Sequence, residues 1–172
     1  MIKGGTGGAL TNVTGLKFER ETDISEAFQA AGLKVAGDNV FDGEHLICIL
    51  MRKRALYRYL QTQDVDWQDY ISSSMEPDEC LYFPKSNHFL IIEKKWQEVA
   101  GSVDEKLAAC DFKLKRYLRL FKPLEASCSM IYLLNDWFKH PRYKDVLDYM
   151  TASNCEVYFQ EIPSSVLKQF AG

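Results

Sequence analysis

The sequence predicts an α/β protein with a central mixed β-sheet flanked by helices. Short apolar runs with strand character, such as residues 45–50 and 89–92, alternate with segments of helical periodicity. Both runs are apolar on two faces, which is typical of strands in the middle of a covered sheet. Helices also separate most of the expected strands along the chain, and this order favours a mixed sheet over an all-β fold.

Length and composition indicate an ordinary globular protein. The chain has 172 residues, of which 47% are hydrophobic and 26% are charged, so we expect residues 1–172 to form one domain. No apolar run approaches the roughly 18 residues of a membrane span. The N-terminus lacks the apolar segment of a signal peptide.

Cysteine usage and net charge narrow the classes further. The five cysteines are widely spaced, and we expect them to be reduced core residues of a cytoplasmic protein. With no Cys-x-x-Cys pair and only three scattered histidines, a zinc site is not expected. The net charge of −3 does not favour a uniform surface for polyanions, although a local basic face would suffice for nucleic acid.

The first third of the chain predicts a helix followed by two strands. The glycine-rich residues 4–8 form either a flexible arm or a backbone close to a phosphate, but not a Walker loop. Thr11 or Asn12 can cap a helix that runs to Ala31, and Glu19 lies at the margin of its apolar face. Glu19 is therefore either solvated or able to reach a neighbouring site. Strands are expected at residues 33–40 and 44–51.

The basic segment that follows predicts a helix over residues 53–61. Arg52, Lys53, Arg54 and Arg58 make it a candidate DNA contact, and a solvated helix face is an equally good interpretation. A short helix is expected at residues 67–71, within a loop.

The C-terminal half predicts three more helices and two strands. A capping box at residues 102–105 begins an amphipathic helix that Pro123 ends. Residues 128–133 predict a buried strand, and His140 can cap a helix over residues 141–152. A last strand at residues 154–159 and a short helix at 163–170 complete the chain.

Residues 75–97 predict a β-hairpin with charged side chains at its open end. Its arms are residues 81–83 and 88–92, joined by the turn residues 84–87. If Phe83 pairs with His88, Asp78 lies opposite Glu93 and alternation adds Lys95 to the same face. Two carboxylates and an ammonium there predict a divalent-metal site with a positioned cation.

A solvated, charged hairpin end is the alternative interpretation. The strand is apolar on both faces, however, and the end of a central strand tends to line a crevice. A buried carboxylate pair would also need a cation to remain ionised.

Pro77-Asp78 followed by Glu93-Lys94-Lys95 resembles the motif of the PD-(D/E)XK nuclease superfamily. The order of elements is similar to that family's core, and the whole resembles small type II restriction endonucleases. The resemblance implies a restriction-endonuclease-like fold. It also implies that Asp78, Glu93 and the carbonyl of Lys94 bind metal, and that Lys95 orients the attacking water or stabilises charge.

Two further site residues follow from the resemblance alone. Glu19 matches an acid on the first helix that some members use through a water or a second metal. Gln97 is a further site residue provided that strand geometry continues through Trp96.

The resemblance implies Mg²⁺, with Mn²⁺ as a substitute, and cleavage of double-stranded DNA at a specific sequence by a homodimer in a prokaryotic cytoplasm. The alternatives are a repair, recombination or transposition nuclease of the same superfamily and a non-catalytic DNA-binding relative. No nucleophilic triad is indicated. The candidate DNA contacts are Arg52, Lys53, Arg54, Arg58, Lys85 and Asn87.

Overall fold

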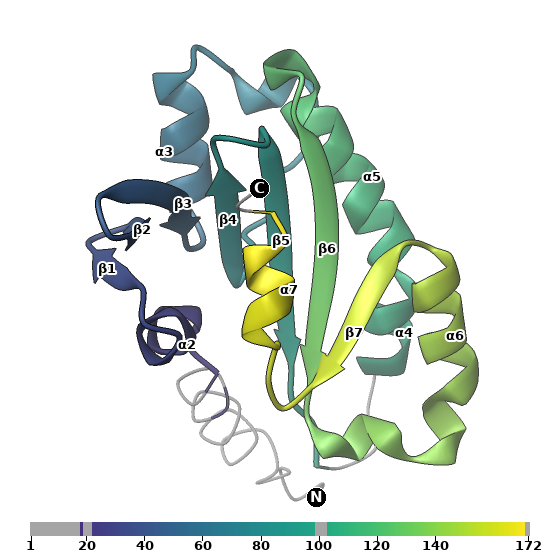
Figure 1. The fold of residues 1–172 in the computed structure, drawn as a ribbon. Coiled ribbons are helices and arrows are strands. Elements are labelled where there is room, and N and C mark those ends of the chain that lie inside the picture. The colour runs from purple at the N-terminus through teal and green to yellow at the C-terminus, as the bar shows by residue number, and fades with distance from the viewer. Residues whose placement is uncertain (1–17, 19–21, 99–102, 171–172) are drawn as a thin grey trace, which may run out of the picture.

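The protein folds around a seven-stranded mixed sheet with strand order β1-β2-β3-β4-β5-β6-β7 (Figure 1). The structure is a computed structural model that describes residue 18, residues 22–98 and residues 103–170, with the backbone alone at 103 and 104. The strands are β1 (Lys34–Ala36), β2 (Asn39–Asp42), β3 (His45–Met51), β4 (Glu79–Phe83), β5 (His88–Lys95), β6 (Ser127–Leu134) and β7 (Cys155–Phe159).

Strands β1 to β5 pair antiparallel in sequence order, and β5, β6 and β7 pair parallel. The predicted mixed sheet with flanking helices is therefore confirmed. The helices are α2 (Ile24–Ala30), α3 (Ala55–Thr62), α4 (Val103–Ala108), α5 (Cys110–Phe121), α6 (Lys144–Ala152) and α7 (Ser164–Lys168), with short 3-10 turns η1 (Trp67–Asp69), η2 (Lys122–Leu124), η3 (Asp136–Lys139) and η4 (Pro141–Tyr143).

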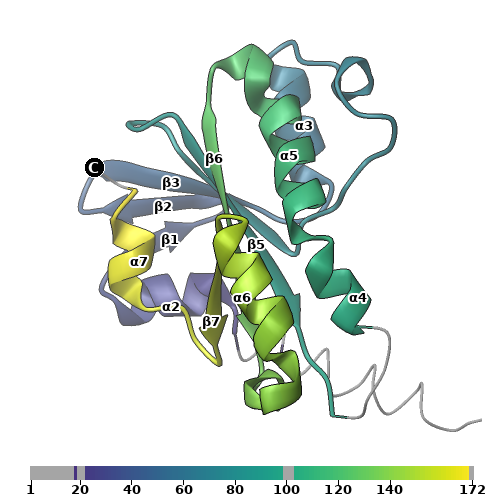
Figure 2. The ribbon, with the colours of Figure 1, turned by 90° about the vertical axis from the view of Figure 1, so that its right-hand side faces the viewer.

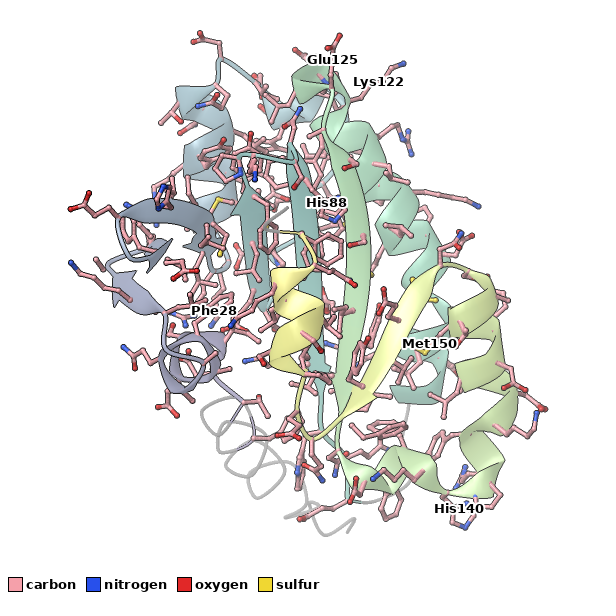
Figure 3. The ribbon with its side chains drawn as sticks, in the orientation of Figure 1. Phe28, His88, Lys122, Glu125, His140 and Met150 are labelled. Carbon is pink, nitrogen blue, oxygen red and sulfur yellow. The ribbon has the colours of Figure 1, made fainter. Side chains whose placement is uncertain are left out.

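Helices cover both faces of the sheet (Figure 2). Side chains of α3, α4, α5 and α6 pack on one face, and those of α2 and α7 pack on the other. Phe28 and Met150, both labelled in Figure 3, belong to these two different cores. Successive residues of β5 point into opposite cores. Phe89 and Ile91 pack with α5, whereas Leu90 and Ile92 pack on the other face of the sheet.

The first predicted strand is in fact a hairpin. Residues 33–40 were expected to be continuous, but β1 ends at Ala36 and β2 begins at Asn39. Gly37 adopts a φ of +62° at the turn, a conformation that glycine reaches without a steric penalty. Leu50 N–H also donates to Asp38 O at 2.7 Å, which ties the turn to β3.

Two predicted helices are interrupted. Most of the helix expected from Thr11 or Asn12 lies outside the described residues, and α2 makes its own start at Asp23, whose carboxylate accepts from Ser25 N–H at 2.7 Å. The helix expected over residues 102–121 breaks at Ala109, which separates α4 from α5. The proposed capping box and the glycine cluster at residues 4–8 fall partly or wholly outside the described residues.

The central hairpin has the predicted register. Phe83 pairs with His88, and the last pair toward the open end is Glu79 with Ile92. Parallel pairing with β6 then places Glu93 beside Tyr132. His140 also caps the next segment as expected, accepting from Arg142 N–H at 3.3 Å.

Two simpler features concern the cysteines and the helices. All five cysteines are free thiols, and four of them are buried. Within the described residues, no helix combines the length and the apolar character needed to cross a bilayer.

Candidate active site

The site is formed where β4 begins and β5 ends. Alternation along β5 directs Glu93 and Lys95 to the face covered by α5, the same face as Phe89 and Ile91. Glu93 is only 4% exposed, because apolar residues of the sheet and of α5 surround it. The apolar run in β5 thus carries a carboxylate into the core.

Asp78 immediately precedes β4 and continues its register. It lies one step beyond the Glu79–Ile92 pair, which places it opposite Glu93. Its Oδ2 atom accepts a hydrogen bond from the backbone N–H of Lys94 at 2.7 Å. This bond fixes the carboxylate against the end of β5.

Three oxygen atoms converge on the ammonium of Lys95. Its Nζ atom lies 2.9 Å from Glu93 Oε2, 3.0 Å from the carbonyl oxygen of Lys94 and 3.5 Å from Asp78 Oδ2. The structure therefore brings together the three side chains that the hairpin register predicted, Asp78, Glu93 and Lys95, and the Lys94 carbonyl that the resemblance implied. Their convergence on one point is the geometry that a hard cation requires of its ligands.

Lys113 is a second cation at this site, and the sequence interpretation did not select it. Its Nζ atom on α5 lies 3.0 Å from Glu93 Oε2, and its side chain is 31% exposed. Its spacing is the signal that could have identified it. Lys113 precedes the buried Tyr117 by four residues, or one helical turn, so the two side chains are neighbours on the helix surface.

Charge and burial oppose each other at Glu93. Burial alone would raise its pKa, but the ammonium groups of Lys95 and Lys113 outweigh burial and hold the pKa below its ordinary value. Burial alone would lower the pKa of Lys95, yet Glu93 and Asp78 raise it. Glu93 is therefore an anion and Lys95 a cation near neutral pH.

Two buried phenols surround Glu93. Tyr132 is its neighbour on β6, and Tyr117 lies on α5. Burial, and next the negative charge of Glu93, raise the pKa of both hydroxyls. Neither hydroxyl has a hydrogen-bond partner among the described residues, so both can bond to water or ligand in the site.

Lys94 and Glu79 belong to the opposite face. Lys94 Nζ lies 3.0 Å from Glu79 Oε2, with both side chains 3% exposed, and it donates to the carbonyl of Thr22 at 2.7 Å. Arg52 contacts Glu79 Oε1 at 3.4 Å and Asp23 Oδ1 at 2.8 Å. This network, Asp23–Arg52–Glu79–Lys94, joins the start of α2 to the hairpin, so only the backbone of Lys94 faces the site.

The expectation for Gln97 depended on strand geometry, which ends at Lys95. The alternation that placed Gln97 beside Lys95 therefore does not extend to it. Gln97 is buried, and its backbone exchanges hydrogen bonds with the amide of Asn135 at 3.2 and 2.9 Å. Glu19 lies outside the described residues.

The candidate DNA contacts divide by position. Lys53, Arg54 and Arg58 lie beside the segment that leads to Asp78, since Lys53 N–H donates to Pro77 O at 3.1 Å. Lys85 and Asn87 lie at the closed end of the hairpin. Asn87 donates to the carbonyls of Leu124 and Glu125 there. Figure 3 labels Glu125 and Lys122 at this end of the sheet. Arg52 is engaged in the Asp23–Arg52–Glu79–Lys94 network.

The converging donors suit a hard divalent cation. Among the residues that the structure describes, no group of three or more His, Cys, Asp and Glu side chains forms a metal site. Two carboxylates and a carbonyl do converge, however, and such a partial oxygen shell suits a cation that keeps several waters. The two buried phenols beside Glu93 supply further partners for those waters.

Comparison with known proteins agrees with this geometry. A family model described as a PD-(D/E)XK nuclease superfamily domain matches residues 16–113, which is more than half of the chain and includes every residue of the site from Asp78 to Lys113. No curated protein and no solved structure matches. The chain therefore belongs to the PD-(D/E)XK nuclease superfamily.

Proposed function

We propose that the protein is a magnesium-dependent endonuclease that hydrolyses phosphodiester bonds of double-stranded DNA. The observation that carries this proposal is the convergence of Asp78, Glu93 and the Lys94 carbonyl on Lys95 Nζ. Asp78, Glu93 and the carbonyl hold the cation, with Mn²⁺ as a substitute for Mg²⁺. Glu19 is an additional candidate ligand, and Gln97 is a candidate only through its position near the site.

Lys95 acts as a cation in this proposal. Its raised pKa keeps it protonated near neutral pH, so it donates hydrogen bonds to the attacking water or to phosphate oxygens and does not accept a proton. Lys113 holds Glu93 in its ionised form from the other side. Magnesium, when bound, supplies positive charge that polarises the phosphodiester and makes hydroxide available near neutral pH.

Hydrolysis needs no covalent enzyme intermediate. Water adds its oxygen to phosphorus, the bond to one strand oxygen breaks, and that oxygen leaves with a proton. Lys95 stabilises the negative charge that develops during this exchange. The buried hydroxyls of Tyr117 and Tyr132 can orient water beside Glu93.

The substrate class has two candidates within the superfamily. The first is the restriction type, in which a two-fold pair of chains cuts both strands of a palindromic sequence. The second is a nuclease of repair, recombination or transposition, which reads DNA structure. A nucleotide-sized pocket beside the segment that leads into Asp78 favours the second.

Plasmid cleavage tests the site. With Mg²⁺, the wild-type protein should cut plasmid DNA, and EDTA should abolish cutting. Asp78→Ala, Glu93→Ala and Lys95→Met should each reduce the rate by at least about 100-fold, because each removes a ligand or the charge that stabilises the transition state. Sequencing the fragment ends then separates the two classes, since discrete ends at one palindrome indicate the restriction type.

Glu125→Ala is the matched control, because Glu125 is an acid at the far end of the sheet, beside Asn87. It should cut like wild type. Unchanged cutting by both Asp78→Ala and Glu93→Ala would overturn the site assignment.

A further inference from the structure

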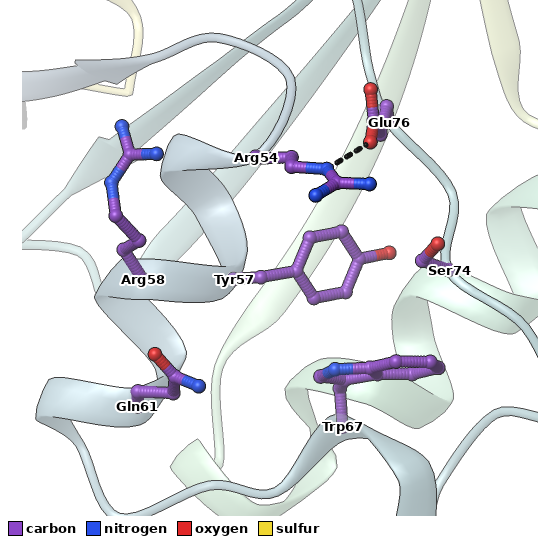
Figure 4. Close-up of a pocket in the computed structure, with 7 residues that line it drawn as sticks. All are labelled: Arg54, Tyr57, Arg58, Gln61, Trp67, Ser74 and Glu76. Atoms are coloured by element: carbon purple, nitrogen blue, oxygen red, sulfur yellow. Dashed lines mark hydrogen bonds and ion pairs between the residues drawn. The ribbon is translucent and has the colours of Figure 1, made fainter.

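A pocket of about 320 Å³ opens beside the segment that leads into Asp78 (Figure 4). Arg54 and the α3 residues Tyr57, Arg58 and Gln61 form one wall, and Trp67 and the chain at residues 74–76 form the other. Small-molecule sites span roughly 300–1,000 Å³, so this pocket matches one nucleotide and is too small for a duplex.

Backbone contacts fix the pocket to the catalytic segment. Tyr57 Oη donates to Met75 O at 2.7 Å and accepts from Met75 N–H at 2.5 Å. Arg54 Nε pairs with Glu76 Oε1 at 2.9 Å. Residues 75 and 76 are therefore held by the pocket wall, three and two positions before Asp78. A ligand in the pocket would lie beside residues 75 and 76, which lead directly into Asp78 of the candidate active site.

The lining is aromatic and cationic. The rings of Tyr57 and Trp67 lie 5.5 Å apart at 68°, and both face the space between the walls (Figure 4). Arg54 is 82% exposed and neutralises Glu76, the only acid among the described residues of the lining. Arg58 forms no ion pair with any described residue, which leaves the pocket with a net positive charge.

Such a lining suits a nucleotide. Bases stack on aromatic side chains with about 1–3 kcal/mol each, and guanidinium groups bind phosphate through several hydrogen bonds. The amide of Gln61 can also bond to a base edge. A solvated helix face explains the arginines but not the aromatic side chains that line the concave surface with them.

We propose that this pocket binds one unpaired nucleotide of the DNA substrate, with the base against Trp67 and the phosphate at Arg58. This inference rests on the proposed nuclease function and narrows its substrate to DNA with an unpaired nucleotide near the cleaved bond. Flaps, overhangs and mismatches have this property. Arg54 assists by releasing Glu76 and binding the phosphate in its place.

Binding measurements in Ca²⁺ test the proposal apart from cleavage. A 2-aminopurine base is placed either unpaired or fully paired in otherwise identical DNA, and its fluorescence and the anisotropy of a second label are recorded. Wild type should quench the unpaired base and bind that DNA more tightly than the paired duplex. Arg58→Ala and Gln61→Ala should remove most of this preference, and Trp67→Ala should weaken binding by about 5- to 150-fold.

Lys122→Ala is the control, since Lys122 is an exposed cation at the far end of α5. Because Trp67 packs on Tyr57, the exposed Arg58 and Gln61 variants keep the test valid if Trp67→Ala fails to fold. Equal binding of both DNAs by wild type, or an unchanged preference in Arg58→Ala and Gln61→Ala, would overturn the proposal. Loss of cleavage in Mg²⁺ is scored separately, so failure of the nuclease function is distinguishable from failure of the pocket.

Discussion

Lys113 shows how one side chain from a separate helix can set the ionisation of a carboxylate in the candidate active site. Glu93 is buried, and burial alone would keep it protonated to a higher pH. Two ammonium groups, 2.9 and 3.0 Å from the same oxygen, reverse that tendency. Lys95 also touches Asp78 and the Lys94 carbonyl, whereas Glu93 is the one acid among the described residues that pairs with Lys113. Lys113 is thus a positioning residue for Glu93.

Replacing Lys113 should move the acid limb of the pH–rate profile. In Lys113→Met the pKa of Glu93 rises, so a larger fraction of the carboxylate is protonated at each mildly acidic pH. Cleavage should then fall at a higher pH than in wild type, and raising the pH should restore most of the rate. Initial rates measured between pH 5 and pH 8 in Mg²⁺ check this shift, which a merely structural residue would not produce.

Lys115→Met is the control for this experiment. Lys115 lies two residues away on the same helix, is exposed and pairs with Asp111 at 2.7 Å. Its profile should match wild type. A Lys113→Met profile that is scaled down but not displaced would contradict the role assigned to Lys113.

At the scale of elements, the open end of the hairpin is held from both faces of the sheet. Neighbouring residues of β5 point in opposite directions, so Lys95 enters the site and Lys94 enters the Asp23–Arg52–Glu79–Lys94 network. That network joins α2 to β4 and β5, since Ile24 N–H also contacts Glu79 Oε1 at 3.4 Å. The position of α2 and the geometry of the site therefore depend on the same two strands.

Breaking the buried pair should destabilise the fold strongly. Lys94→Met leaves the buried Glu79 with Arg52 alone, and removing one partner of a buried pair typically costs about 3–5 kcal/mol. The double variant Glu79→Gln/Lys94→Met should recover much of this loss, because no uncompensated charge remains. Urea denaturation gives the free energies of unfolding. A double variant as unstable as Lys94→Met would show that the charge of Glu79 is not the cause.

The sequence predicted the hairpin and the convergence of charged side chains at its open end, because local chemistry determines both. Turn residues 84–87 set the pairing of Phe83 with His88, and alternation then carried the prediction to Asp78, Glu93 and Lys95. Lys113 was missed because its contact depends on how α5 packs on the sheet. The break at Ala109 was also missed, because no proline or glycine lies there to indicate it. The start of α2 at Asp23 was missed because the apolar spacing on either side of this residue favoured one long helix.

At the scale of the whole molecule, an acidic net charge coexists with locally cationic surfaces. The net charge is −3, yet Arg54 and Arg58 line a pocket with a single acid. In the net charge, acidic residues at the site and in the Asp23–Arg52–Glu79–Lys94 network offset cations that lie elsewhere. Binding of DNA thus depends on where the charges lie, and the overall sum is a poor guide to it.

Metal binding should stabilise the entire domain, because the proposed ligands come from two strands that only folding brings together. A ligand that binds only the folded chain adds about 2.7 kcal/mol at a free concentration near 100 times its Kd, which corresponds to several degrees in Tm for a chain of this size. Thermal unfolding with and without Mg²⁺ should show this rise in wild type and in Lys122→Ala, but not in Asp78→Ala or Glu93→Ala. Lys95→Met should keep the rise, because it removes the ammonium that shares the same oxygens and leaves the ligands intact. An equal rise in Asp78→Ala and Glu93→Ala would place the metal elsewhere.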